Sequence, residues 1–248
     1  MQIYKIKIIM YLFINDDSFL FEYMSIFEDN NNKNIITFII PTIGRETLNY
    51  SINSIINQTN KNWKCIIVFD GVKNNFDIIH ENIEVYEIEK TKGVINQASD
   101  VRNYGIQKAH SNWIAFLDDD DTIANDYVEI LYNEQQIFDF DIYIFRMKME
   151  QRIIPSHLSF DFKICDVGIS FVCHKNVFHK IMFKNSHTED FEFLDNARKN
   201  NYKIIISNTI KYFVKEIYNK NIILSDLPIH NKIFINCLNP YLFLHLLV

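Results

Sequence analysis

The 248-residue chain contains little glycine, proline or cysteine: five, four and four residues respectively. With 48% hydrophobic and 23% charged residues, this composition excludes a collagen-like or wholly disordered protein and supplies enough apolar material for a core. The cysteines Cys65, Cys165, Cys173 and Cys237 are dispersed, and no Cys-x-x-Cys spacing occurs. We therefore expect reduced thiols and neither a disulfide framework nor a zinc site, which favours a cytoplasmic protein.

Long apolar runs and an excess of positive charge are also missing. Lys5 and Lys7 interrupt the apolar N-terminal run, and Asp16 and Asp17 follow it. This leaves far fewer than the roughly 18 to 20 apolar residues that a membrane span needs, and no small-residue cleavage site suggests a signal peptide. The formal net charge of -6 argues against nucleic acid as a partner, because non-specific binding depends on lysine and arginine neutralising phosphates.

Changes in composition divide the chain into three parts. A polar break at residues 28–34 separates an N-terminal extension, residues 1–34, from a main domain that we place at residues 35–220. Residues 221–248 form an apolar tail interrupted by two prolines. We expect the tail to pack against the domain, and peripheral contact with a membrane surface is the alternative.

In the main domain, short apolar runs rich in β-forming residues alternate with helical patterns. This alternation is typical of strand-helix-strand units and predicts an α/β fold with a mostly parallel sheet. Strands are expected at residues 35–41, 64–71, 83–88, 112–117, 142–147 and 202–206, with a short apolar run at 168–173. Helices are expected at residues 45–57, 95–109, 125–136 and 189–200.

Four consecutive carboxylates, Asp118, Asp119, Asp120 and Asp121, follow the apolar strand at 112–117 directly. Like charges this close raise one another's pKa, so we expect a cation beside them. In open α/β sheets, ligands collect at the carboxyl ends of the strands, and Mg²⁺ or Mn²⁺ prefers oxygen ligands from carboxylates and phosphates. A solvated acidic turn near a helix start is the alternative, but the preceding buried strand favours the metal site.

Several motifs occur in a defined order: a strand running into Pro41 and Thr42 with Arg45 after it, a strand ending at Asp70, the group Arg102-Asn103 with Gly105, and the acidic segment FLDDDD. This ordered set spans about residues 35–123 and resembles the nucleotide-sugar domain of family 2 glycosyltransferases with the GT-A fold. Weaker similarity continues to about residue 213. The resemblance implies a three-layer sandwich in which helices cover both faces of a mostly parallel central sheet.

The resemblance also implies a nucleotide site. Pro41, Thr42 and Arg45 would line the pocket for the base, and Asp70 would hydrogen-bond the uracil or its equivalent. Arg102 would lie beside the nucleotide and its diphosphate. Each residue also has an ordinary structural explanation: Pro41 can end a strand, Arg45 can lie on a helix surface, and Asp70 can begin a turn.

For the acidic segment, the resemblance implies a D-x-D metal site. Asp118 would lie near the ribose and the metal, Asp119 would contribute to the nucleotide site, and Asp120 would be the principal ligand of Mn²⁺ or Mg²⁺. The family often supplies a later histidine near the metal, but the segment KYFVKEIYN contains none. A third protein ligand is therefore left unassigned.

The segment SHTEDFEFLDNARKNNYKI resembles the acidic pair that the family places at the start of a late helix. Ser186 and Glu189 fit a capping box, which would give Glu189 a structural role. Asp190 is then our preferred general base, with Glu189 as the second candidate. The alternative is that the helix dipole alone favours both acids.

The leading hypothesis is a metal-dependent, inverting glycosyltransferase that moves a sugar from a nucleotide-diphosphate donor, expected to be a UDP-sugar, to the hydroxyl of a glycan or other acceptor. A nucleotidyltransferase is disfavoured, because no glycine-rich phosphate loop or basic cradle accompanies FLDDDD. A non-catalytic nucleotide-sugar or glycan-binding protein is the non-enzymatic alternative.

Overall fold

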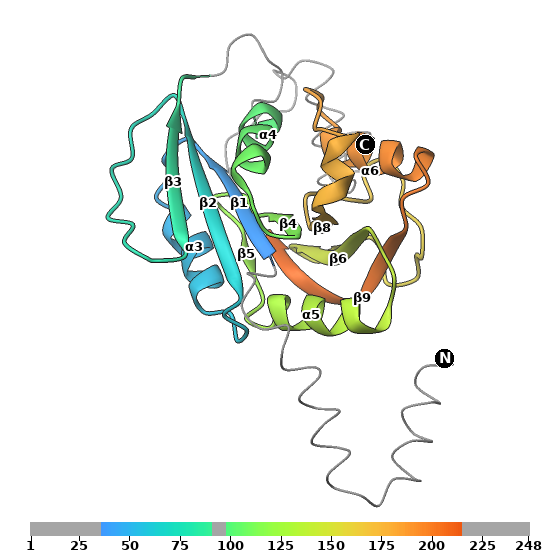
Figure 1. Cartoon of the computed structure of the whole chain (residues 1–248). Helices are drawn as coiled ribbons and strands as arrows, with labels where there is room; N and C mark the ends of the chain where they lie inside the picture. The colour runs from blue at the N-terminus through green and yellow to red at the C-terminus, as the bar shows by residue number, and fades with distance from the viewer. Residues whose placement is uncertain (1–35, 91–97, 215–248) are drawn as a thin grey trace, which may run out of the picture.

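The computed structural model describes residues 36–90 and 98–214, which form one nine-stranded sheet and its covering helices (Figure 1). The strands are β1 (Ile36–Thr42), β2 (Trp63–Asp70), β3 (Ile83–Ile88), β4 (Trp113–Phe116), β5 (Thr122–Ile123), β6 (Ile142–Met149), β7 (Arg152–Ile154), β8 (Phe171–His174) and β9 (Ile204–Val214). The helices are α3 (Leu48–Ile56), α4 (Ala98–Lys108), α5 (Tyr127–Ile137) and α6 (Glu189–Lys199), with a 3-10 turn η1 (Lys175–His179).

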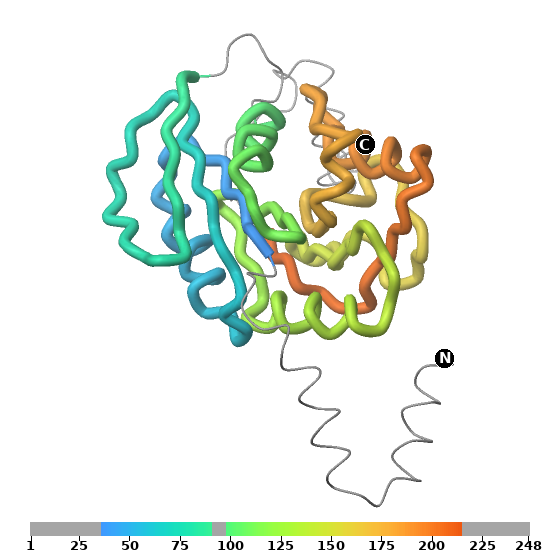
Figure 2. Tube along the Cα trace, in the orientation of Figure 1, coloured from blue at the N-terminus to red at the C-terminus, as the bar shows by residue number. Residues whose placement is uncertain are grey.

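The sheet has the strand order β3-β2-β1-β4-β8-β6-β9-β5, with β7 paired to β6. Neighbouring strands from β3 to β4 are parallel, as are β6 and β9, whereas β8 runs antiparallel to both β4 and β6. Helices α3 and α4 lie on opposite faces of the parallel half, as the trace in Figure 2 shows. The α/β class and the mostly parallel sheet predicted from the sequence are confirmed.

Buried apolar residues explain why the central strands form. Ile36, Phe38, Ile39 and Ile40 of β1 are all fully buried, as expected of a parallel strand covered on both faces. Helix α4 packs very closely on this strand, because a Cβ added at Gly105 would lie only 2.5 Å from the side chain of Ile39. Glycine at this position therefore sets the spacing between α4 and β1.

The observed elements differ from the predicted ones mainly in the second half of the chain. Strand β9 continues to Val214 instead of ending near residue 206, and the apolar run at 168–173 forms strand only from Phe171. Strands β5 and β7 were not predicted, because two or three residues carry no detectable periodicity. The proposed extension 1–34 and tail 221–248 lie outside the described residues. Within those residues, no helix has the length and apolar character needed to cross a bilayer.

The cysteines differ from one another in state. Cys65 and Cys173 are free and buried, and burial raises the pKa of both thiols. Cys165 is disulfide-bonded, so the expectation of reduced thiols is wrong for this residue. The cysteines thus no longer argue for a reducing compartment, and a cytoplasmic location stays a prediction.

Candidate active site

The carboxyl ends of three parallel strands meet at one edge of the sheet. Strand β1 ends at Thr42 and β2 at Asp70, while the chain leaving β4 continues through Leu117 into Asp118. The Leu117 N–H still donates to the Ile39 carbonyl at 3.1 Å, which keeps this segment beside β1. The acidic segment therefore lies at the carboxyl ends of the parallel strands, as expected from its place after a buried strand, at the edge that commonly binds ligands in α/β sheets.

Thr42 and Arg45 hold the middle of the acidic segment. The Thr42 hydroxyl donates to Asp119 Oδ2 at 2.6 Å, and Arg45 Nη1 lies 2.8 Å from Asp119 Oδ1 and 3.0 Å from Asp120 Oδ2. Burial raises the pKa of Asp119, while the Thr42 hydrogen bond and the Arg45 charge oppose this shift. Asp119 is thus a buried anchor of the turn, and the half-exposed Arg45 stands at the opening of the site.

A buried ion-pair network connects the acidic segment to α6. Arg102 of α4 donates from Nη2 to Asp118 Oδ1 at 2.6 Å and from Nη1 to Glu189 Oε1. The Ser99 hydroxyl donates to the other carboxylate oxygen of Glu189. Burial alone would lower the pKa of Arg102, but the surrounding carboxylates outweigh it and raise the pKa. Arg102 therefore stays charged and joins residues that lie 71 positions apart in the sequence, Asp118 and Glu189.

Asp190, the first choice for the general base, lies next to this network. Its Oδ1 atom is buried and has no hydrogen-bond partner within the described residues. Burial raises the pKa of Asp190 to about 8, with the charges of Glu189 and Asp118 acting in the same direction and that of Arg102 opposing them. A carboxyl group with a pKa this close to neutral is suited to proton transfer.

The capping box proposed for the start of α6 is wrong. The helix begins at Glu189 after Thr188, and Thr188 provides no side-chain cap. Ser186 accepts a hydrogen bond from the Thr188 N–H at 3.1 Å, and both hydroxyls donate to Glu192 instead of interacting with Glu189. Glu189 is drawn into the protein because Arg102 and Ser99 offer it stronger, buried partners.

The acidic segment has the chemistry of a site for a hard divalent cation. Each arginine pairs with a single oxygen of Asp118 or Asp120, so the second oxygen of each carboxylate takes no part in these ion pairs. Burial raises the pKa of Asp120, and the charge of Asp118 raises it further, a repulsion that a cation would relieve. The residues therefore fit Mg²⁺ or Mn²⁺.

The protein provides few further ligands for such an ion. In the described part of the chain, no group of three His, Cys, Asp or Glu residues is arranged to hold a metal. A pair of carboxylates completed by substrate phosphates is the usual arrangement for Mg²⁺. A third protein ligand thus stays unassigned.

Two residues assigned to the base pocket lie at the ends of the central strands. Asp70 is 3% exposed at the end of β2, and Pro41 is half-buried opposite Val68. Gly71, after Asp70, has a φ of +70°, and a Cβ there would lie 2.3 Å from the Lys90 Cβ, so the turn requires glycine. The participation of Pro41 and Asp70 in base binding stays a prediction.

Three polar residues that support the site were missed by the sequence reasoning. Ser51 donates to the carbonyls of Asp118 and Asp121 at 3.1 and 2.7 Å, and the buried Tyr212 hydroxyl accepts from the Asp118 N–H at 3.1 Å. The third is Ser99. A signal existed for Ser99, because it lies three positions before Arg102 and so shares a helix face with it.

Comparison with solved structures supports the fold. S. aureus TarS 1-349 in complex with UDP-GlcNAc superimposes with a TM-score of 0.63 at 17% identity, covering 82% of this chain and 64% of that one. The mannosyltransferase PcManGT from Pyrobaculum calidifontis, in complex with GDP-Man and Mn²⁺, gives a TM-score of 0.60 at 11% identity, covering 77% and 59%. The architecture is thus that of the GT-A glycosyltransferases.

Sequence comparison finds glycosyltransferases among the similar proteins. The poly(ribitol-phosphate) beta-N-acetylglucosaminyltransferase TarP of Staphylococcus aureus is 25% identical over 219 residues, which cover 81% of this chain and 66% of TarP. Two further curated bacterial glycosyltransferases are 38% and 34% identical, but this chain spans only 41% and 16% of their lengths. Residues 37–152 match the family described as "Glycosyl transferase family 2". This match contains β1, the acidic segment and Arg102, so this part of the chain is similar to glycosyl transferase family 2, in agreement with the GT-A architecture.

Proposed function

We propose that the protein is a metal-dependent, inverting glycosyltransferase that moves a sugar from a nucleotide-diphosphate donor to an acceptor hydroxyl. The similarity to glycosyl transferase family 2 and the GT-A fold support sugar transfer in general. Metal dependence, inversion and the roles of individual residues are the further content of the proposal. A UDP-sugar is the proposed donor, because the TarS structure contains UDP-GlcNAc.

The observation that carries the proposal is the placement of Asp190 beside the acidic segment. Arg102 pairs with both Asp118 and Glu189, and Glu189 immediately precedes Asp190 in α6. A donor held at Asp118 and an acceptor held at Asp190 would therefore lie close together, separated by the buried side chain of Arg102. Bringing two substrates together in this way is a major part of catalysis of group transfer.

The chemistry assigned to the chain's own residues is a direct displacement. The ionised Asp190 carboxylate would take the proton of the acceptor hydroxyl while its oxygen attacks the anomeric carbon of the donor. The bond from that carbon to the diphosphate oxygen breaks, and the nucleoside diphosphate leaves with the electron pair. A cation held by Asp118 and Asp120 would supply charge neutralisation for the departing diphosphate. Attack opposite the leaving group inverts the anomeric configuration.

The arginines have distinct places in this scheme. Both terminal nitrogens of Arg102 are paired with carboxylates, so we assign it the positioning of Asp118 and of the start of α6 in place of direct diphosphate binding. Arg45 is half-exposed and is the better placed of the two to reach a nucleotide.

A donor screen followed by product analysis tests the proposal. UDP-GlcNAc, UDP-glucose and GDP-mannose are each added to the protein with Mn²⁺ or with EDTA, and the melting temperature is recorded. We expect a UDP-sugar to raise the melting temperature in Mn²⁺ and to have little effect in EDTA, because a ligand that binds only the folded state stabilises it. Equal stabilisation in EDTA would refute the metal assignment.

The mechanism is tested by the product and by two matched variants. The configuration of the new glycosidic bond is read by NMR, and retention would refute direct displacement. Asp190→Asn should keep donor binding and lose transfer by about a hundred- to ten-thousandfold, the usual contribution of a general base. Full transfer by Asp190→Asn combined with none by Glu189→Gln would move the role of base to Glu189.

A further inference from the structure

The loop that joins β7 to β8, residues 155–170, carries three exposed apolar side chains. Leu158 is 91% exposed, Phe160 81% and Ile164 50%. Single exposed apolar residues are common on protein surfaces, whereas apolar residues that gather in one place indicate a surface that a partner covers. The β7–β8 loop is therefore a candidate docking surface.

The backbone of this loop is held in place by a buried arginine. Arg146 of β6 is fully buried, and its Nη1 atom donates to the carbonyls of Pro155 and Ser156. Its Nη2 atom donates to the Ser159 carbonyl at 3.1 Å. Leu158 lies within the stretch that Arg146 holds, so its exposure is a feature of a fixed backbone.

The loop has one side that packs on the protein and one side that does not. Phe162 is buried against Phe191 of α6, and the Arg198 guanidinium lies 4.8 Å from the centre of the Phe162 ring. Arg198 also pairs with Asp161 at 3.1 Å. Phe160, two positions before Phe162, is exposed instead. The interior of the domain thus takes up one aromatic ring of the loop and leaves the other for a partner.

A disulfide in the same loop indicates what that partner is. Cys165 is disulfide-bonded, whereas Cys65 and Cys173 are free and buried. The chain contains four cysteines, so within one chain the partner of Cys165 can only be Cys237. Cys237 belongs to the apolar C-terminal tail, residues 221–248, which lies outside the described residues.

The last described residue lies close enough for the tail to reach the loop. In the sheet, Met149 of β6 pairs with Val214 of β9 on one side and with Arg152 of β7 on the other. Two strand spacings separate Val214 from Arg152, which is about 10 Å. Arg152 Nη2 in turn donates to the Cys165 carbonyl at 2.7 Å. Cys237 follows Val214 by 23 positions, a length of chain that spans up to about 75 Å when extended.

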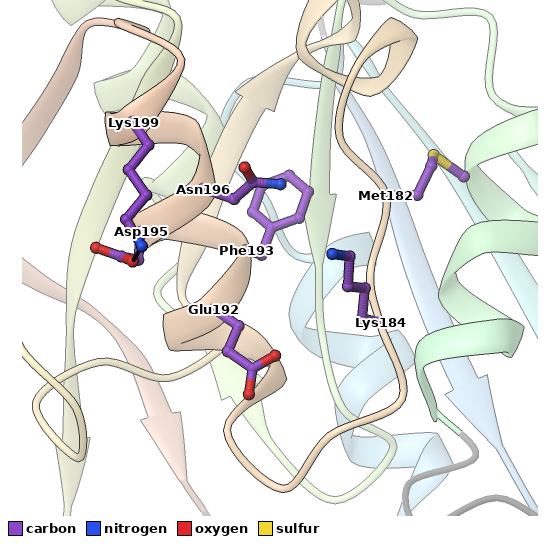
Figure 3. A pocket seen from close by; sticks show the side chains of 7 residues that line it. All are labelled: Met182, Lys184, Glu192, Phe193, Asp195, Asn196 and Lys199. Atoms are coloured by element: carbon purple, nitrogen blue, oxygen red, sulfur yellow. Dashed lines mark ion pairs between the residues drawn. The ribbon is translucent and has the colours of Figure 1, made fainter.

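A second hollow beside α6 does not suit an apolar segment. Figure 3 shows a pocket of about 230 Å³ between α6 and the segment that carries Met182. Most of the residues that line it are charged, namely Lys184, Glu192, Asp195 and Lys199. Covering charged groups with apolar side chains removes their water and costs free energy. The exposed apolar side chains of the β7–β8 loop are the better match for the tail.

We propose that the C-terminal tail, residues 221–248, docks on the β7–β8 loop, with Cys237 bonded to Cys165 and apolar tail residues covering Leu158 and Phe160. The segment LNPYLFLHLLV, which follows Cys237 directly, supplies the apolar side chains. When the disulfide forms from two thiols, oxidised glutathione accepts the two electrons and two protons and becomes two molecules of glutathione. The inference does not depend on the proposed function.

Peptide mapping identifies the partner of Cys165. The full chain is equilibrated in mixtures of oxidised and reduced glutathione, blocked with N-ethylmaleimide without reduction, digested and analysed by mass spectrometry. We expect one linked pair of peptides that contains Cys165 and Cys237, with Cys65 and Cys173 unlinked. The inference is wrong if Cys165 stays free in every mixture, is joined only to glutathione, or is joined to a second chain.

The same equilibrium measures docking, because it gives the effective concentration of the Cys237 thiol at Cys165. The double variant Leu158→Asp, Phe160→Asp should lower this effective concentration at least about tenfold, since the apolar contacts that hold the tail are lost. Ile79→Asp is the control: Ile79 lies between β2 and β3 and is 87% exposed, and this variant should match the parent. All three replaced side chains are exposed, so the fold should be retained. An unchanged effective concentration in the double variant would mean that another partner, such as a second copy or a lipid surface, covers Leu158 and Phe160, and would overturn the docking.

Discussion

Asp190 should make the protein less stable as the pH rises through neutrality, and replacing it with asparagine should abolish that loss. The folded-state pKa of about 8 lies above the ordinary value of 3.8. Below the lower pKa, Asp190 is neutral in both the folded and the unfolded state, and the free energy of unfolding is unaffected. As the pH rises from the lower to the higher pKa, the unfolded chain loses this proton while the folded protein keeps it, so the free energy of unfolding falls. Each pH unit in this window costs about 1.4 kcal/mol, so the loss between pH 5 and pH 8 is about 4 kcal/mol.

The measurement is urea unfolding of the parent and of Asp190→Asn at pH 5, 6, 7 and 8, with EDTA present. Asparagine has nearly the shape of the neutral carboxyl group and cannot ionise, so the stability of the variant relative to the parent should increase by about 4 kcal/mol over this range. For a domain of this size, the corresponding difference in melting temperature is roughly 8 to 16 °C.

A matched control separates this effect from the general pH response. Asp77 is exposed, and Asp77→Asn should follow the parent at every pH. The reasoning about Asp190 is refuted if the difference between Asp190→Asn and the parent stays constant from pH 5 to pH 8. Such a constant difference would mean that Arg102 holds Asp190 ionised in the folded protein over this whole range, as it is in the unfolded chain.

Three further outcomes follow from the site. Arg102→Met should lower the free energy of unfolding, measured in urea, by about 3 to 5 kcal/mol, because it leaves Glu189 buried without its cation. Adding Glu189→Leu to this variant should restore part of the lost stability. If the effects of the two substitutions on the free energy of unfolding simply add, the pairing is contradicted. Asp120→Asn should remove the dependence of UDP binding on Mn²⁺ in calorimetry, and a variant that still requires Mn²⁺ would exclude Asp120 as a ligand. Asp70→Ala should weaken UDP binding by about 1 to 3 kcal/mol through a lost hydrogen bond to the base, and unchanged affinity would place the base elsewhere.

The parallel half of the sheet could be predicted because its strands carry their own signal. Strands β1, β2 and β4 are nearly continuous apolar runs, and each was placed within about two residues of its observed bounds, while β3 was predicted at its observed residues. Strands buried on both faces read as unbroken hydrophobic segments. The short strands β5 and β7 form through pairing with β9 and β6, which no local pattern reveals.

The site was predictable in its location and less so in its contacts. A run of carboxylates after a buried strand was enough to place Asp118 to Asp121 at the edge of the sheet. The role of Glu189 was misjudged, because its partner Arg102 lies 87 residues earlier in the chain and only the folded structure brings the two together. Local capping rules predict that Glu189 interacts within the first turn of α6, but the ion pair with the buried Arg102 is the stronger interaction.

The close packing of Gly105 against Ile39 affects the proposed active site, although Gly105 itself is not part of that site. Arg102 lies one helical turn before Gly105, so a side chain added at 105 would displace the helix and, with it, the arginine that aligns Asp118 with the start of α6. In the proposed mechanism, the contact between α4 and β1 therefore sets the distance between the donor at Asp118 and the acceptor at α6. In a mutational survey, Gly105 should score as an active-site residue, although inspection of the substrate pockets would never select it.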